Sequence, residues 1–251
     1  MNSIKYDYEI EGVGYSTIRQ TEPRIAAYIT KALGNARTVL NVGAGTGSYE
    51  PQDRYVVAVE PSSVMRSQRP KHLSPAVTAS AESLPFDDAA FEASMAILTV
   101  HHWSDLSKGL LEMRRVTSGQ VIIVTFDTDV LSSSWFAQYV PEFVEVERKR
   151  CPAIITVTDV LGGVSRIESI PVPFVCIDGI QEAYYGRPEG LLDQRVRRCQ
   201  SIWGVLPEGV EERFVKDLSG DLASGEWDSK YGYFRQLPQF ECALRLITNL
   251  P

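Results

Sequence analysis

Apolar residues gather in short runs that are separated by glycines and polar turns. Four runs rich in Val, Leu and Ile, at 37–42, 55–60, 91–98 and 121–126, show little alternation with polar residues. Such runs are typical of parallel strands covered on both faces. A weaker run at 75–79 predicts one further strand. The pattern therefore predicts a buried, mostly parallel sheet.

Helical patterns lie between these strands. The stretch "TEPRIAAYITKALGN" places apolar residues at helical spacing, offers Thr21 as a cap and ends at Gly34. A second helix is predicted from about 104 to 117, with Gly119 ending it. Alternating strands and helices predict an α/β fold with a doubly wound sheet.

After Asp127 the rhythm changes. Helical stretches at 134–150 and 208–219 mix with Pro-rich segments, and two late strands are predicted at 166–176 and 240–248. The sheet is thus expected to have seven strands, with a helical lid inserted between the last two. Without a polar linker, one domain is expected, divided into a cap helix (1–36), a cofactor-binding core (37–127), a lid region with the acceptor pocket (128–239) and a last strand (240–251).

Composition and charge exclude several classes of protein. With 44% apolar and 23% charged residues in 251, the chain is globular rather than disordered. The net charge of −7 argues against a nucleic-acid-binding surface, and the mixed run at 145–150 is expected to be a solvated helix face. No apolar stretch reaches the roughly 18 residues of a membrane span. The first twelve residues are too acidic and polar for a signal peptide, so we expect a cytoplasmic protein.

The cysteines predict neither a zinc site nor a disulfide framework. Cys151, Cys176, Cys199 and Cys242 lie more than twenty residues apart, without a C-x-x-C pair. Of the three histidines, two are adjacent and point in different directions on any regular element. We therefore expect reduced thiols and no bound metal.

A glycine turn after the first strand carries the strongest chemical signal. Gly43, Gly45 and Gly47 let the backbone turn sharply and let a ligand approach closely. The next strand ends on Glu60, and an acid there can accept hydrogen bonds from both hydroxyls of a ribose. Together they indicate a cofactor that contains adenosine.

Three cofactor classes compete for this turn. A phosphate-binding P-loop is excluded because no Gly-Lys pair follows. A dinucleotide fingerprint is incomplete, since Ser48 takes its last glycine position. The helix that would hold a pyrophosphate is reduced to "SYEPQDR", with Pro51 inside it. A nicotinamide-dependent dehydrogenase is therefore a distant possibility, and an adenosine carried on a sulfonium fits best.

Residues 37–127 resemble the class I S-adenosylmethionine-dependent methyltransferases, in the branch that includes the ubiquinone/menaquinone-biosynthesis type. The resemblance rests on "VLNVGAGTG", "VVAVEPS", "SAESLPFDDAAF", "LTVHHWSDL" and "EMRRVTSGQVIIVTFD" in the right order and spacing. The stretch "VPFVCIDGIQEAYYGRPEGLLD" is similar to a bacterial subgroup of these enzymes. The resemblance implies a Rossmann-like methyltransferase fold, with S-adenosyl-L-methionine as cofactor and S-adenosyl-L-homocysteine as product.

The resemblance also implies roles for single residues. The glycine turn would line the methionine part, Glu60 would hold the ribose, and Tyr15 and Arg19 would close over the methionine carboxylate. Asn41 departs from the family, which often has Asp there, and Ser80 stands where an acid often contacts the adenine. The implied cofactor-binding set is Tyr15, Arg19, Gly43, Ala44, Gly45, Gly47, Glu60, Pro61, Ser80, Ala81, Glu82 and Leu98.

Methyl transfer from a sulfonium is an in-line displacement that can be accelerated by alignment of donor and acceptor. A base is needed only if the acceptor must lose a proton. His102, and after it His101, are predicted as that base; alternatively, one of them caps or packs against the start of the following helix and the other lines a wall. Trp103, Asp178, Tyr184, Tyr185 and Arg187 are predicted to bind a planar or anionic acceptor, unless "YYGRP" is merely a packed turn.

Two functions follow from this reading. The favoured one is a methyltransferase with a small-molecule acceptor, present as a monomer or homodimer and without a nucleic-acid partner. The alternative is a protein that binds the cofactor, has lost transferase activity and acts as a regulator or partner subunit. Asn41 and Ser80 are the features that suggest the alternative.

Overall fold

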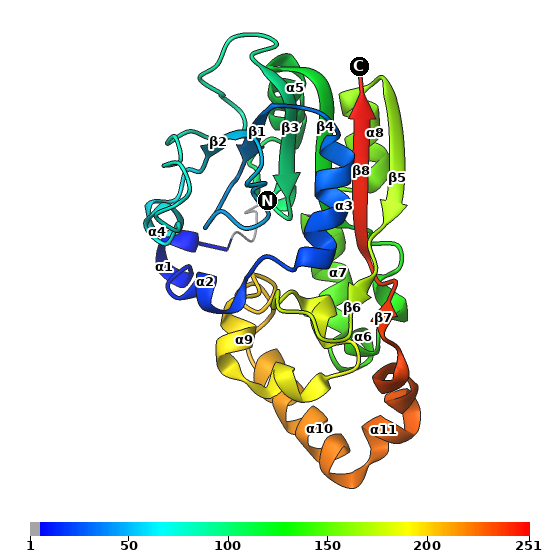
Figure 1. Cartoon of the computed structure of the whole chain (residues 1–251). Coiled ribbons are helices and arrows are strands. Elements are labelled where there is room, and N and C mark those ends of the chain that lie inside the picture. The colour runs from blue at the N-terminus through cyan, green and yellow to red at the C-terminus, as the bar shows by residue number, and fades with distance from the viewer. Residues whose placement is uncertain (1–5) are drawn as a thin grey trace.

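A six-stranded sheet forms the centre of the computed structural model, which describes residues 6–251 (Figure 1). Its strands lie in the order β2 (Tyr55–Val59), β1 (Thr38–Val42), β3 (Phe91–Ile97), β4 (Thr117–Phe126), β8 (Leu244–Leu250) and β5 (Val164–Ser169). Neighbouring strands from β2 to β4 are parallel, and β8 is antiparallel to both of its neighbours. The predicted α/β fold with a mostly parallel sheet is confirmed.

The prediction of seven strands in this sheet was wrong for the described residues. The predicted strand at 75–79 is reduced to one parallel bridge between Val59 and Val77 at the outer edge of β2. Pro75 has no N–H to donate, and Val77 is exposed, so no apolar contact stabilises a longer strand there.

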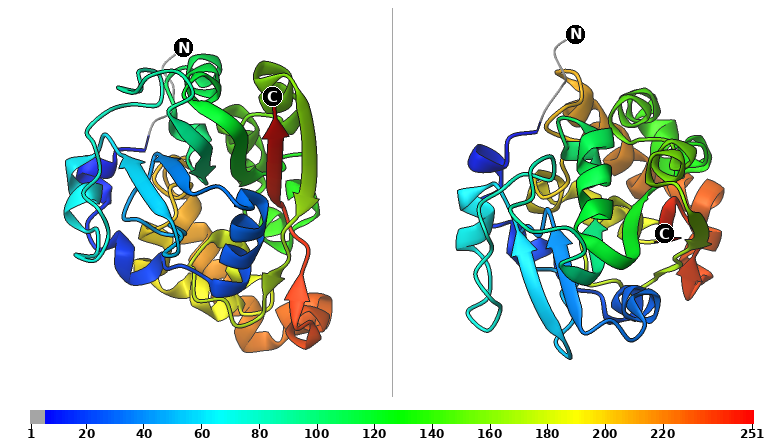
Figure 2. Two further views of the ribbon diagram at one scale, coloured as in Figure 1. Left: turned by 45° about the horizontal axis from the view of Figure 1, so that its top comes forward. Right: turned by 90° about the horizontal axis from the view of Figure 1, so that it is seen from above.

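Helices cover both faces of the sheet. Helix α3 (Pro23–Leu33) lies on one face, and α5 (Leu106–Arg115) and α8 (Ile154–Leu161) lie on the other (Figure 2). Because successive strand residues point to opposite faces, Val39 packs in the cluster with α3, while Leu40 packs in the cluster with α5 and α8. The sheet is therefore buried on both sides, as its unbroken apolar runs predicted.

Two predicted helix boundaries differ from the structure. The N-cap of α3 is Glu22, whose carboxylate accepts from Arg24 N, and Thr21 Oγ1 accepts from Tyr49 N instead. Helix α5 ends at Arg115, and Gly119 already lies in β4. A Cβ at Gly119 would lie 2.3 Å from the carbonyl oxygen of Glu92, so this glycine permits close strand pairing.

A lid with its own core covers the carboxyl ends of the strands. We use the term lid for residues 128–150 and 170–243, which contain α6 (Trp135–Tyr139), α7 (Pro141–Arg150), α9 (Gln194–Arg198), α10 (Val210–Ser224) and α11 (Glu226–Tyr231). A small second sheet pairs β6 (Val172–Pro173) with β7 (Gln239–Phe240). The core of the lid contains many aromatic side chains, among them Trp135, Phe136, Trp203, Phe214, Trp227 and Phe234. The predicted insertion between the last two strands of the sheet is present (Figure 1).

Prolines explain where long predicted elements divide. The predicted helix at 134–150 becomes two helices because Pro141 starts α7. The predicted strand at 166–176 leaves the main sheet after Ser169, next to Pro171 and Pro173. Within the range 128–239 that was assigned to the lid, α8 and β5 belong to the layers of the main sheet.

The predicted solvated face at 145–150 is only partly exposed. Glu145 and Lys149 form an ion pair in solvent. Glu147, two residues after Glu145 and so on the other side of the helix, is buried and pairs with Arg150, whose side chain is also buried. The run therefore contributes one charged pair to the interior.

The four cysteines are free thiols, as predicted, and three of them are buried. No helix within residues 6–251 combines the length and the apolarity needed to cross a bilayer.

Candidate active site

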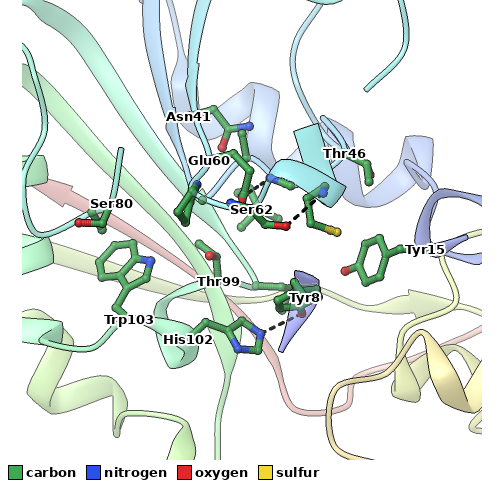
Figure 3. Close-up of a pocket in the computed structure, with 18 of the residues that line it drawn as sticks. Tyr8, Tyr15, Asn41, Thr46, Glu60, Ser62, Ser80, Thr99, His102 and Trp103 are labelled. Atoms are coloured by element: carbon green, nitrogen blue, oxygen red, sulfur yellow. Dashed lines mark hydrogen bonds between the residues drawn. The ribbon is translucent and has the colours of Figure 1, made fainter. Parts of the chain in front are cut away.

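A cavity of about 430 Å³ opens at the carboxyl ends of β1, β2 and β3 (Figure 3). Ligands of doubly wound folds bind at this edge of the sheet. Ser80 and Trp103 lie at one end of this main cavity, Tyr15 and Thr46 lie at the other, and Glu60 lies between them. The cavity is therefore elongated, with chemically different ends.

The glycine turn after β1 lines this cavity for a partly different reason than predicted. Gly43, Gly45 and Gly47 all have a positive φ. A Cβ at Gly43 would lie 2.1 Å from Thr99 Oγ1, and one at Gly47 would lie 2.3 Å from Leu73 Cδ1. These two glycines are required by packing within the protein. Only Gly45, whose Cβ would meet nothing closer than 3.4 Å, leaves space for a ligand.

The predicted residues of the turn are thus divided between cavity and interior. Gly43, Ala44 and Gly45 line the main cavity, whereas Gly47 does not. The side chains of Leu73 and Arg69 lie closest to Gly47.

Glu60 lies directly after β2, and its carboxylate spans two loops. One oxygen accepts a hydrogen bond from Gly45 N at 2.8 Å, and the other accepts one from Ser62 N at 2.8 Å. Burial raises the pKa of this carboxyl above its ordinary value, although both amides oppose the shift. Each carboxylate oxygen can accept more than one hydrogen bond, so Glu60 keeps accepting capacity on the cavity wall.

Asn41 is matched to its surroundings. Its amide Nδ2 donates to Glu50 Oε1 at 3.0 Å, and Glu50 forms a buried ion pair with Arg69 at 2.9 Å. An aspartate at position 41 would place a second carboxylate against Glu50, which repulsion disfavours. The departure of Asn41 from the family pattern is therefore explained by Glu50.

Arg19 anchors the end of the cavity next to Tyr15. Its Nε lies 2.5 Å from Asp178 Oδ1, and its Nη1 donates to Tyr15 Oη at 2.7 Å. Tyr49 Oη donates to Asp178 Oδ2 at 2.7 Å. Arg19, Tyr15 and Tyr49 line the main cavity, while Asp178, from the lid, supports them from behind. The guanidinium uses three of its N–H groups here and keeps others for an anionic ligand.

Glu82 organises the opposite end of the cavity. Its Oε1 accepts from Ser104 N at 2.7 Å, from Ser104 Oγ at 2.8 Å and from Asp105 N at 3.1 Å. Burial opposes ionisation, but these hydrogen bonds and one from Ser80 lower the pKa of Glu82 to about 2. Glu82 therefore holds the loop after β3 next to the segment that contains Ser80 and Ala81.

Trp103 forms part of this end as well. Its ring packs on Gly109 in α5, where a Cβ would lie 2.5 Å from ring atom Cε3. The glycine inside this helix thus creates the space that keeps Trp103 on the cavity wall.

The two adjacent histidines face different cavities. His102 lines the main cavity, and its Nε2 shares a hydrogen bond of 3.0 Å with Tyr8 Oη. Burial raises the pKa of Tyr8 well above its ordinary value, so the phenol remains neutral. Its oxygen can accept a hydrogen bond from Nε2–H of His102, a tautomer in which Nδ1 is the nitrogen that can accept a proton. His101 lies 4.0 Å from His102, measured between ring centroids, and does not line the main cavity.

His101 instead lines a smaller cavity of about 60 Å³ between the sheet and the lid, which we call the middle cavity. Its lining includes Tyr8, Leu98, Gln181 and Glu182. Burial lowers the pKa of His101 well below its ordinary value, so its imidazole is neutral.

A third cavity, of about 220 Å³, lies inside the lid, and we call it the lid cavity. Tyr184 and Tyr185, predicted as acceptor residues, line it. Arg187 lines none of the three cavities and donates to the carbonyl oxygens of Cys176 and Ala183, contacts typical of a packed turn.

Several residues on the wall of the main cavity were missed by the sequence analysis. Tyr8 is the most consequential, because it contacts His102 from α1 (Tyr8–Glu11), a helix of four residues. No periodicity in so short a segment could have revealed it. Others that the sequence analysis did not identify are Tyr6, Asp7, Glu9, Thr46, Ser48, Tyr49, Ser62, Met65, Ile97, Thr99 and Ser104.

Comparison with known proteins supports the cofactor class that the site suggests. Residues 40–125 match the family model described as "Methyltransferase domain". The chain is 35% identical over 122 residues to malonyl-[acyl-carrier protein] O-methyltransferase of Erwinia billingiae (strain Eb661), a match that covers 44% of this chain and 48% of the relative. The matched region thus spans about half the length of that curated relative.

Solved structures extend the similarity to the lid. A putative methyltransferase from an antibiotic biosynthesis pathway of Anabaena variabilis ATCC 29413 is 29% identical, with 93% of this chain and 99% of that chain covered and a TM-score of 0.85. A possible histamine N-methyltransferase of Thermotoga maritima, 15% identical over 97% of this chain and 91% of its own, with a TM-score of 0.54, shares the fold. The chain therefore contains a class I S-adenosylmethionine-dependent methyltransferase domain and has the Rossmann-like fold of these structural neighbours.

Proposed function

We propose that this protein transfers a methyl group from S-adenosylmethionine to a small-molecule acceptor by in-line displacement. The observation that carries the proposal is the position of Glu60. Its carboxylate connects the glycine turn after β1 with the loop after β2, on the wall of a cavity of about 430 Å³. The cavity size lies within the range of ordinary small-molecule sites.

The residues of the main cavity fit the parts of this cofactor. Glu60 has accepting capacity for the ribose hydroxyls, and Arg19 has unused N–H groups for a carboxylate. Ser80, Glu82 and Trp103 form the end that suits an adenine ring. When bound, S-adenosylmethionine supplies an electrophilic methyl group on a sulfonium, with a neutral leaving group.

The departures from the family pattern favour the transferase over the inactive alternative. Asn41 is paired with Glu50, and Ser80 hydrogen-bonds to Glu82, so neither leaves an unfilled role. The features that suggested loss of activity are thus accounted for by neighbouring side chains of this chain.

His102 is the proposed proton acceptor for an acceptor that must lose a proton. It lines the main cavity, whereas His101, with its lowered pKa, lines the middle cavity. Tyr8 is a positioning residue in this proposal, because its phenol holds His102 Nε2 at 3.0 Å.

Calorimetry followed by a transfer assay tests the proposed function. We expect S-adenosylmethionine and S-adenosylhomocysteine to bind with one-to-one stoichiometry and NAD to show no binding. Radiolabelled S-adenosylmethionine should then label a component of a small-molecule metabolite extract. Absence of donor binding would contradict the proposal, and tight donor binding without any transfer would favour the regulatory alternative.

The role of His102 has its own test. His102→Gln should lower turnover by at least about a hundredfold and leave the donor Kd nearly unchanged, because general base catalysis acts on the chemical step. His72→Gln, at an exposed position, is the matched control and should change neither quantity. Unchanged turnover in His102→Gln would remove the base from the mechanism.

A further inference from the structure

The three cavities adjoin one another through shared wall residues. Tyr8, Arg19 and Leu98 line both the main and the middle cavity. Gln181 and Glu182 line both the middle and the lid cavity. The middle cavity therefore lies between the proposed cofactor site and the interior of the lid.

Unpaired polar atoms gather in the middle cavity. Among the described residues, seven buried side-chain nitrogen or oxygen atoms have no hydrogen-bond partner, and three of them line this cavity. They are His101 Nδ1, Gln181 Oε1 and Glu182 Oε2. A buried polar atom without a partner is costly and rare, so three together indicate a site that is completed by a bound molecule.

The charges around this cavity favour a hydrogen-bond donor over an anion. Arg19 is paired with Asp178, and the nearby Glu147 is paired with Arg150. Glu182 has no basic partner among residues 6–251 in any ion pair of the structure, and burial, with Glu147 as a further contribution, raises its pKa to about 7. The two unpaired oxygens, on Gln181 and Glu182, can accept hydrogen bonds, and an anion would be repelled by the carboxylate.

The lid cavity has the opposite character. Its wall contains the aromatic side chains of Trp135, Phe136, Tyr184, Tyr185, Phe234 and Phe240. Aromatic rings at this density contact flat apolar molecules through stacked and edge-to-face arrangements. A volume of about 220 Å³ suits a ring system of modest size.

We propose that the methyl acceptor is an elongated molecule with a hydroxyl or amine head and a flat apolar body. A hydroxyl head donates its one hydrogen bond to Glu182 in the middle cavity, next to His101, an amine head can donate a second one to Gln181, and the body occupies the lid cavity. This inference rests on the proposed methyltransferase function and assigns its acceptor class. It keeps the planar molecule expected from the aromatic residues and Arg187 and discards the anionic one, because the guanidinium of Arg187 donates to backbone carbonyls.

Binding of three matched probes to the protein saturated with S-adenosylhomocysteine tests the proposal. The probes are 2-naphthol, 2-naphthoate and naphthalene, measured by calorimetry at pH 8, where Glu182 is ionised. We expect 2-naphthol to bind with a Kd of about 1 mM or below, and at least about tenfold more tightly than the other two, since hydrogen bonds to charged groups are the stronger ones.

Two variants locate the head and the body separately. Glu182→Leu removes the carboxylate and should abolish the preference for 2-naphthol over naphthalene. Cys242→Phe fills the lid cavity, which Cys242 lines from a partly exposed position, and should weaken 2-naphthol by at least about tenfold. Glu241→Gln, an exposed residue on the same cavity wall, is the matched control and should leave the affinity unchanged.

The failure of this inference is distinguishable from the failure of the proposed function. If S-adenosylhomocysteine does not bind the wild-type protein, the proposed function is contradicted. If it binds, and 2-naphthol shows no saturable binding at about 1 mM, binds no better than 2-naphthoate, or keeps its preference in Glu182→Leu, the assigned acceptor class is overturned. Unchanged 2-naphthol affinity in Cys242→Phe overturns the placement of the body.

Discussion

The main cavity and the middle cavity share three residues but are built differently. The main cavity is lined largely by loops at the ends of adjacent strands, and none of the described residues that line it has a buried side-chain nitrogen or oxygen without a hydrogen-bond partner. The middle cavity is lined by side chains from α1, α7, the loop after β3 and the lid, and several of its polar atoms lack partners.

Two carboxylates illustrate the contrast. Glu82 receives hydrogen bonds from Ser104, Asp105 and Ser80, and its pKa is lowered to about 2. Glu182 has one buried oxygen without a partner, and its pKa is raised to about 7. The carboxylate of Glu82 is thus satisfied by the protein itself, whereas Glu182 keeps an oxygen that the proposed acceptor would satisfy.

The largest effect is expected from breaking the ion pair between Asp178 and Arg19, the residue whose side chain lines both cavities. Asp178→Ala leaves the guanidinium of Arg19 buried without its counter-ion, because the Asp178 side chain is 1% exposed and that of Arg19 is 13% exposed. We expect the free energy of unfolding to fall by about 3–5 kcal/mol in urea denaturation. Donor affinity should fall as well, since Arg19 and Tyr49 lose their common anchor.

Glu142→Ala is the control for this variant. Glu142 pairs with Arg213 in a half-exposed position, so its loss should cost less than about 1 kcal/mol. Equal losses in the two variants would show that the Arg19–Asp178 pair has no special structural role.

The next effect is a pH dependence of the free energy of unfolding that arises from the raised pKa of Glu182. Between pH 4.5 and about 7 the unfolded chain ionises this carboxyl while the folded protein keeps its proton, so stability should fall as the pH rises. The expected fall is about 2–3 kcal/mol between about pH 5 and pH 8, measured by urea denaturation. Glu182→Gln should flatten the profile and should be the more stable protein at the higher pH.

Glu82 should act in the opposite direction. Its stabilising contribution is present above pH 4.5 and is lost as the pH falls toward 2. Glu82→Gln should therefore lower stability at neutral pH and leave the fall between pH 5 and 8 intact. If Glu182→Gln retained the wild-type profile, the contrast between the two carboxylates would be wrong.

Substitutions at Gly43 and Gly45, in the same turn, distinguish a glycine required by internal packing from one that leaves space for a ligand. Gly43→Ala drives a Cβ into Thr99 in a left-handed conformation and should cost about 2–4 kcal/mol of stability. Gly45→Ala meets only the conformational strain, about 1–2 kcal/mol, and should weaken donor binding more than its stability loss explains.

Thr99→Gly in the Gly43→Ala background should recover part of the lost stability, because the collision is removed while the strain remains. A larger stability loss for Gly45→Ala than for Gly43→Ala would contradict the assignment of Gly43 to internal packing.

The smallest effect concerns the adenine end of the main cavity. Gly109→Ala places a methyl group against the ring of Trp103, and a side chain can shift to accommodate it. The gain in helix propensity, about 1 kcal/mol, should offset much of the packing cost, so stability stays nearly constant. Donor affinity should fall a few-fold because Trp103 leaves its position on the wall; unchanged affinity would exclude Trp103 from the site.

The contrast between the cavities also explains what could be predicted from the sequence. The glycine turn, Glu60 and the loop after β3 follow buried strands directly, so a local motif indicates their place in the fold. Tyr8, Tyr49 and Glu182 reach their positions through contacts between segments far apart in the chain. No local pattern encodes such contacts, so the positions of these three residues could not be predicted from the sequence.

The fold shows the same difference between features that follow from a local pattern and features that depend on neighbouring segments. The core strands were predicted from their apolar runs, whereas the strand at 75–79 depended on an edge that nothing covers. Gly47 was assigned to the ligand because a glycine motif does not reveal which neighbour requires the missing Cβ.

The central claim is that the carboxylate of Glu60 holds the methyl donor. Its most direct test is the calorimetric Kd of S-adenosylmethionine for Glu60→Ala and Glu60→Gln, with Glu92→Gln as the control. Glu92 accepts hydrogen bonds from Arg37 at an exposed position. We predict at least about tenfold weaker binding for Glu60→Gln, a greater loss for Glu60→Ala and no change for the control. A folded Glu60→Ala protein that binds the donor as tightly as the wild type would contradict the claim.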